Sequence, residues 1–261
     1  MKNWLTLTVL AGCLFGFTTA ALAEDDLEAV QRRIIEAWRK HKSLTANIVM
    51  SSRLQLGESV VDGMGTGTYE FLKQGDKLLS RLEIRSTLVQ KQGTEERKIE
   101  QAMTSISDGD IAHTISEMGA EKTVIKTKVE PRQSGDPQRV FEFLARDSGL
   151  RLMPEDTLDG RKLYVIEVTP RRTAPLQPVK QLLSFDQESG FLMRIVGLGA
   201  DDTPQASMTY KDVKIDEHID PDHFKFQAPE GVEIIDETGA TPPASGPASA
   251  PAAQPSGAAK P

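Results

Sequence analysis

The strongest constraint on this chain is a change of hydrophobic period near Ser43, from a helical repeat to alternation. Residues 65–72 and 77–88 place mainly apolar or small side chains on one side of the alternation and mostly polar or charged ones on the other. Because successive side chains of a strand point to opposite faces, this pattern predicts antiparallel strands with one apolar and one solvated face. Such a sheet needs other elements to cover its apolar side.

Tight-turn dipeptides recur between runs of strand-forming residues. Asp108-Gly109, Asp159-Gly160 and Ser189-Gly190 each separate two such runs. Aspartate or serine followed by glycine suits the short turn of a β-hairpin. The sequence therefore predicts three hairpins of a meander, with further strands at Ser207–Ile215 and Phe224–Phe226 near the end.

Two segments carry the helical period instead. Leu27–Leu44 is amphipathic, and either Asp25 or Asp26 is a suitable N-cap. The second helix is expected from Asp136-Pro137 to about Asp147, because a capping aspartate followed by proline is typical of a helix start. The order of helix, strands, helix and strands predicts the α+β class.

The N-terminus reads as an export signal. Residues 1–23 combine a positive start, an apolar run and the small-residue site Ala21-Leu22-Ala23. This arrangement predicts cleavage and an exported mature protein that starts at Glu24. Two alternatives stay open: the run is long enough for an uncleaved anchor, and Leu10–Cys13 resembles a lipobox, in which Cys13 would carry a lipid.

The C-terminal segment 238–261 consists almost only of alanine, proline, serine, glycine and threonine. It has too little apolar surface to offset the entropy of ordering, so we expect a disordered tail. The domain between signal and tail is residues 24–237, which is enough for one sizeable core. Because Cys13 is the only cysteine, the mature chain would have no disulfide and no cysteine-ligated metal.

Composition and motifs exclude several function classes. The formal net charge is −7 and the sequence has no basic run, so nucleic acid is not an expected partner. No GxSxG, HExxH, P-loop or helix-opening GxGxxG occurs, so we predict no catalytic residue and no cofactor. Gly63–Gly67 leads into a strand, where glycine permits a bulge or a close backbone approach.

The histidines give only a weak metal signal. His218–His223 is dense in carboxylates and imidazoles, but its spacing matches no ligand motif and serves equally well as turn chemistry. We therefore predict no metal site, although a hydrolase built on this cluster remains a third reading. His41 and His113 are isolated in sequence and are expected to be surface or strand residues.

Several segments together resemble the LolA family of periplasmic carriers of outer-membrane lipoproteins, with its relatives LolB and RseB. Besides the N-terminal helix, the resemblance lies in Gly65–Lys73, Ile106–Asp110, Phe141–Arg146, Leu183–Gly190 and His223–Asp236. The resemblance implies an incomplete antiparallel β-barrel whose concave apolar face is closed by helices and holds acyl chains. The chain departs from the family at Lys73-Gln74-Gly75, because Gln74 cannot supply the charged residue that holds the carriers' lid.

The resulting expectation is a monomeric periplasmic carrier that binds lipid or lipoprotein acyl chains in a hydrophobic cavity, in outer-membrane lipoprotein sorting. The alternative is an envelope sensor or scaffold of the same fold, with a solid core and a protein partner. For each lining candidate the competing interpretation is simple core packing. The predicted cavity-lining residues are Ile34, Trp38, Tyr69, Phe71, Leu82, Ile84, Phe141 and Leu144.

Overall fold

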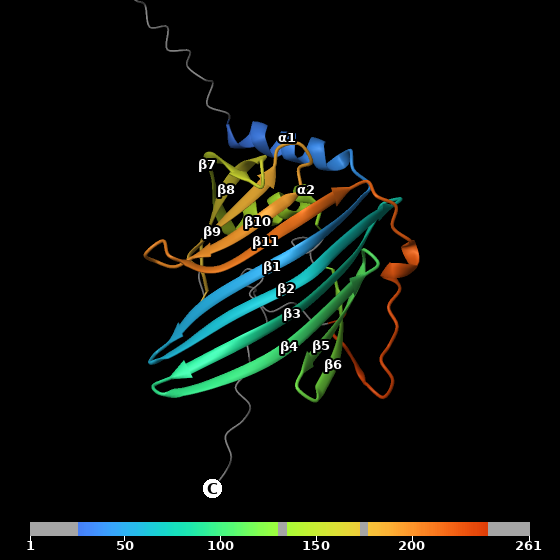
Figure 1. Cartoon of the computed structure of the whole chain (residues 1–261). Helices are drawn as coiled ribbons and strands as arrows, with labels where there is room; N and C mark the ends of the chain where they lie inside the picture. The colour runs from blue at the N-terminus through green and yellow to red at the C-terminus, as the bar shows by residue number, and fades with distance from the viewer. Residues whose placement is uncertain (1–25, 130–134, 173–176, 240–261) are drawn as a thin grey trace, which may run out of the picture.

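The computed structural model describes residues 26–129, 135–172 and 177–239. The predicted signal peptide, Cys13 and nearly all of the predicted tail lie outside these residues. Within them, twelve strands form one open sheet, with two α-helices on its inner side (Figure 1). The predicted α+β fold with an incomplete antiparallel barrel is confirmed. Among the described residues, neither helix has the length and apolar character needed to cross a bilayer.

The sheet begins with four long strands that form consecutive hairpins. They are β1 (Ser43–Leu56), β2 (Ser59–Gln74), β3 (Lys77–Gln92) and β4 (Glu95–Ser107). β2 and β3 pair without interruption from Ser59 opposite Gln92 to Gln74 opposite Lys77. Tyr69 is therefore opposite Leu82, and Glu70 opposite Arg81, so the predicted alternation of faces is present.

Shorter strands complete the sheet on both sides, in the order β12-β6-β5-β4-β3-β2-β1-β11-β10-β9-β8-β7. All neighbours are antiparallel except β12 and β6, which run parallel. The three predicted turns connect β4 to β5, β7 to β8 and β9 to β10. The remaining bounds are β5 (Ile111–Met118), β6 (Glu121–Lys128), β7 (Ser148–Leu158), β8 (Arg161–Pro170), β9 (Lys180–Asp186), β10 (Leu192–Leu198), β11 (Pro204–Ile215) and β12 (Ile234–Asp236).

The two α-helices begin where the sequence predicts. In α1 (Leu27–Arg39) the carboxylate of Asp26 accepts a hydrogen bond from the Ala29 N–H. In α2 (Pro137–Asp147) the carboxylate of Asp136 accepts one from the Gln138 N–H. The predicted extension of the first helix to Leu44 is wrong, since β1 already starts at Ser43 and pairs with both β2 and β11.

A C-terminal strap (Asp216–Glu237) crosses the convex face of the sheet, on the side opposite the helices. The predicted strand at Phe224–Phe226 is wrong: Phe224 ends the 3₁₀ helix η2 (Pro221–Phe224), and no strand follows directly. Phe224 and Ile219 instead pack on Leu72 and Leu79. The convex face is thus partly covered, whereas the alternation predicted a solvated surface.

Candidate functional site

The helices close one half of the concave face with a packed core. Val30 and Ile34 of α1 and Phe141 of α2 pack against Ile166 and Phe185 of the sheet. The Phe141 and Phe185 rings lie 5.3 Å apart between centroids. These side chains are almost fully buried, so this half of the face is solid.

A glycine lets α1 approach the sheet closely. Gly190, in the β9–β10 turn, has a φ of 68°. A Cβ at this position would overlap the carbonyl oxygen of Ile34 and come within 2.7 Å of the Trp38 backbone nitrogen. Because only glycine combines a positive φ with this approach, the turn fixes where α1 docks.

An aromatic cluster lies beside this core, under the C-terminal end of α1. The Phe71 ring is 6.1 Å from Trp38, and Tyr69 stacks 6.2 Å from Phe191. Tyr210 meets the Tyr69 ring edge-on at 5.7 Å. Burial raises the pKa of the Tyr69 hydroxyl above its ordinary value and the pKa of Tyr210 to about 12, so both stay neutral.

Lys73 joins the end of α1 to β2. Its ammonium donates a hydrogen bond to the Trp38 carbonyl oxygen at 2.6 Å and lies 3.3 Å from the centroid of the Trp38 ring. Burial lowers the pKa of Lys73 to about 8, while the carboxylates of Asp136 and Asp216 oppose the decrease and Arg39 adds to it. Lys73 therefore makes a charged contact with α1 that Gln74 cannot make.

The concave face continues beyond the helices as an open half. Register places its apolar side chains on the same face as Tyr69. Leu56 is 38% exposed and Met118 is 42% exposed, and the others are partly buried. The open half comprises Leu54, Leu56, Leu88, Ile99, Met103 and Met118.

Three glycines shape the sheet on this face. Gly63, Gly65 and Gly67 occupy successive concave positions of β2. A Cβ at Gly67 would overlap the backbone carbonyl oxygen of Glu83, and one at Gly65 would lie 2.9 Å from the Ser86 Cβ. These are close backbone approaches, as the sequence predicts for strand glycines.

The structure distributes the eight predicted lining residues over three places. Ile34, Phe141 and Leu144 belong to the core under the helices. Trp38, Tyr69 and Phe71 meet in the aromatic cluster. Leu82 and Ile84 lie on β3, on the same face but in neither core cluster, and lead from the helices toward the open half.

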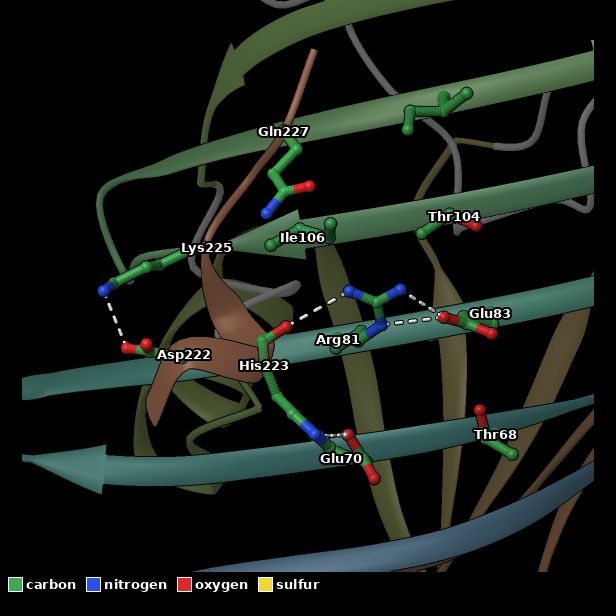
Figure 2. Close-up of a pocket in the computed structure, with 11 residues that line it drawn as sticks. Thr68, Glu70, Arg81, Glu83, Thr104, Ile106, Asp222, His223, Lys225 and Gln227 are labelled. Carbon is green, nitrogen blue, oxygen red and sulfur yellow. Dashed lines mark hydrogen bonds and ion pairs between the residues drawn. The ribbon is translucent and has the colours of Figure 1, made fainter. Parts of the chain in front are cut away.

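Sequence reasoning missed a polar groove of about 600 Å³ on the convex face, between β2–β5 and the strap (Figure 2). Arg81 donates to the Glu83 carboxylate at 2.7 Å and to the His223 carbonyl oxygen at 3.1 Å. His223 Nδ1 lies 3.6 Å from Glu70. The described charges are largely paired with one another, so the groove fixes the strap to the sheet. The only sequence signal was the polar cluster at His218–His223.

The remaining histidines have structural contacts. His41 Nδ1 lies 2.9 Å from the Asp216 carboxylate, and His113 stacks 4.0 Å from the Phe226 ring. In the described part of the chain, no three histidine, aspartate or glutamate side chains are grouped so that they could hold a metal ion.

No family model and no curated protein matches the chain. Solved structures similar to it include MucB, at 18% identity over 80% of this chain and 64% of that one, with a TM-score of 0.46. The MucA/MucB complex from Pseudomonas aeruginosa matches at 19% identity over 76% of this chain and 60% of that one, with a TM-score of 0.44. A LolA superfamily protein from Nitrosomonas europaea matches at 13% identity over 76% and 97%, with a TM-score of 0.28.

This chain spans about three fifths of the length of the MucB chains. At these identities the similarity concerns the fold alone.

Proposed function

We propose that this protein binds a hydrophobic chain, such as a lipid or lipoprotein acyl chain, on the open half of its concave face. The observation that carries the proposal is apolar surface that the described helices leave uncovered, with Leu56 and Met118 more than a third exposed. At about 25 cal/mol per Å², covering a few hundred Å² of apolar surface provides several kcal/mol. That free energy suits reversible loading and release, as a periplasmic carrier in lipoprotein sorting requires.

One observation favours the alternative function, an envelope sensor or scaffold. The half of the face beneath the helices is solid, because Ile34, Phe71 and Phe141 are each at most 5% exposed. A protein of this kind would bind its partner on an outer surface and would take up no acyl chain. The two proposals therefore differ in what the open half does.

Two neighbouring residues of β3 provide a matched test. Leu88 is on the concave face and Val89 is on the convex face, and both are partly buried. We expect the Leu88→Glu variant to take up no fluorescent fatty acid and to show no co-purifying lipid in native mass spectrometry. The Val89→Glu variant should still take up the fatty acid and carry the lipid. If wild-type protein carries no lipid and takes up no fatty acid, the carrier proposal is wrong and the scaffold is favoured.

A further inference from the structure

A small pocket of about 190 Å³ lies where the C-terminal end of α1, the first turn of α2 and two hairpin turns meet. We call it the mouth pocket. Leu78 and Ser80 of β3 contribute to its wall, and both share the concave face with Leu82. The pocket therefore adjoins the concave face at the helix end. From Ser80 to Leu88, β3 covers roughly 26 Å at 3.3 Å per residue.

Trp38, one of the residues that line the mouth pocket, has a buried donor without an acceptor. Trp38 is 8% exposed, and its Nε1 has no hydrogen-bond partner within the described ranges. An indole N–H can only donate, and leaving it buried and unpaired carries a free-energy cost. A ligand oxygen that accepts this hydrogen bond would remove that cost.

Positive groups lie beside the donor. The Lys73 ammonium has three N–H donors, and the contact that orients it goes to a neutral carbonyl oxygen, that of Trp38. Arg139, in the first turn of α2, is a second cation of the wall. Each could compensate a negative charge in the pocket.

Two of the carboxylates in the wall have partners of their own. Asp110 forms an ion pair with Lys77 at 2.7 Å, and Asp136 accepts the N-cap hydrogen bond of α2. Asp76 is exposed in the β2–β3 turn. Among the described residues that line the pocket, Trp38 thus contributes an unpaired N–H and Lys73 an ammonium group whose hydrogen bond goes to a carbonyl oxygen.

We propose that the mouth pocket binds an oxyanion, with phosphate as the simplest case, through Trp38 Nε1 and the Lys73 ammonium. The anion is either free phosphate or the headgroup of an amphiphile whose chain follows β3 along the concave face. Binding of an amphiphile headgroup rests on the proposed function, whereas binding of free phosphate does not. The contact of Trp38 with Phe71 is made by its ring and does not involve the N–H.

The test follows the Trp38 indole proton by NMR in protein labelled with ¹⁵N, with Trp38→Phe to assign the signal. Inorganic phosphate, dihexanoyl phosphatidic acid and octyl glucoside are titrated separately. We expect the two phosphate compounds, but not the uncharged glucoside, to move the indole proton downfield in a saturable manner. Lys73→Gln should weaken phosphate binding at least about tenfold, because a hydrogen bond to a charged group contributes about 1.5–3 kcal/mol.

The matched control is Lys98→Gln, since Lys98 is an exposed lysine on β4 that pairs with Glu100 at 2.8 Å. It should leave phosphate binding unchanged, and a cooperative thermal transition verifies that each variant folds. An indole proton that no phosphate compound moves, or equal binding by Lys73→Gln and wild-type protein, would overturn the phosphate site.

The three titrations distinguish failure of the oxyanion site from failure of the proposed acyl-chain binding. Binding of the glucoside and the phosphatidic acid with equal affinity, and no indole shift, would leave the apolar face as a binding site and overturn the oxyanion site. An indole shift with inorganic phosphate alone supports the oxyanion site, identifies free phosphate as its source, and removes support for an amphiphile on the concave face.

Discussion

Gly67 is the position where a single methyl group tests the curvature of the sheet. In Gly67→Ala the new Cβ would overlap the Glu83 carbonyl oxygen and lie 2.9 Å from the Glu83 carbonyl carbon and 3.0 Å from the Ile84 Cα. Non-bonded carbons prefer about 3.5–4.0 Å, so β2 and β3 must separate by at least roughly 0.5–1 Å. Backbone on both sides is held by continuous pairing. We therefore expect a loss of about 2–3 kcal/mol, near the top of the range for overpacking.

The assay is urea unfolding followed by circular dichroism, with the thermal midpoint as a second readout. A loss of 2–3 kcal/mol corresponds to a midpoint lower by about 4–12 °C in a domain of this size. Gly149→Ala is the matched control, because Gly149 is also a strand glycine and a Cβ there would have its nearest neighbour, the Thr169 carbonyl oxygen, at 3.9 Å. That variant should lie within about 1 kcal/mol of wild-type protein. Equal stability of the two variants would refute the idea that close approach at Gly67 shapes the sheet.

Three further predictions concern the core, the contact of Lys73 with α1, and the strap. Phe141→Ala should lower the free energy of unfolding by about 3–5 kcal/mol in urea titrations, because the ring is 5% exposed and packs on Phe185. The pKa of Lys73 is about 8 in the folded protein, below its ordinary value of 10.5. Between these two values the unfolded state binds more protons than the folded state, so the free energy of unfolding should rise as the pH increases from about 7 to 10. Lys73→Met should lack that component in urea unfolding measured against pH. Asp236→Asn removes the partner of Lys126, 2.9 Å away, and should accelerate hydrogen exchange in β12 while global unfolding changes little.

Helix starts and hairpin turns were predictable because their signals are local. The Asp136 carboxylate caps α2 through a hydrogen bond two residues away. Asp159 and Gly160 both adopt positive φ, 49° and 80°, which this dipeptide accommodates more readily than most. These features depend on a few neighbouring residues, so the sequence contains all the information they need.

The strap and the end of α1 depend on contacts between distant segments. Phe224 is buried by packing on Leu79, which lies on the predicted solvated side of its strand. Ser43 lies in β1 and not in the predicted helix, because it pairs with β2. Its hydroxyl also donates a hydrogen bond to the Glu217 carbonyl oxygen, 2.5 Å away. Alternation within one strand cannot show that a segment more than a hundred residues later will cover its polar face.

The same limit explains why the predicted lining residues do not lie in one place. Ile34 and Phe141 are apolar residues on helix faces, a pattern shared by core packing and by cavity walls. Only the lengths of the helices and strands distinguish core packing from a cavity wall. The missed contact of Lys73 with Trp38 gave no sequence signal, because a lysine at the end of a strand is usually solvated.

Element lengths decide which part of the concave face can be core. A strand of 16 residues such as β2 or β3 is about 53 Å long, whereas a helix is only about 10–12 Å wide. Two helices of 13 and 11 residues at one end of the sheet cannot cover such strands along their whole length (Figure 1). Apolar alternation that continues to Leu88 and Met103 therefore marks surface that these helices do not bury. Substitutions that test ligand binding belong at those two residues, while a change at Phe141 mainly measures folding.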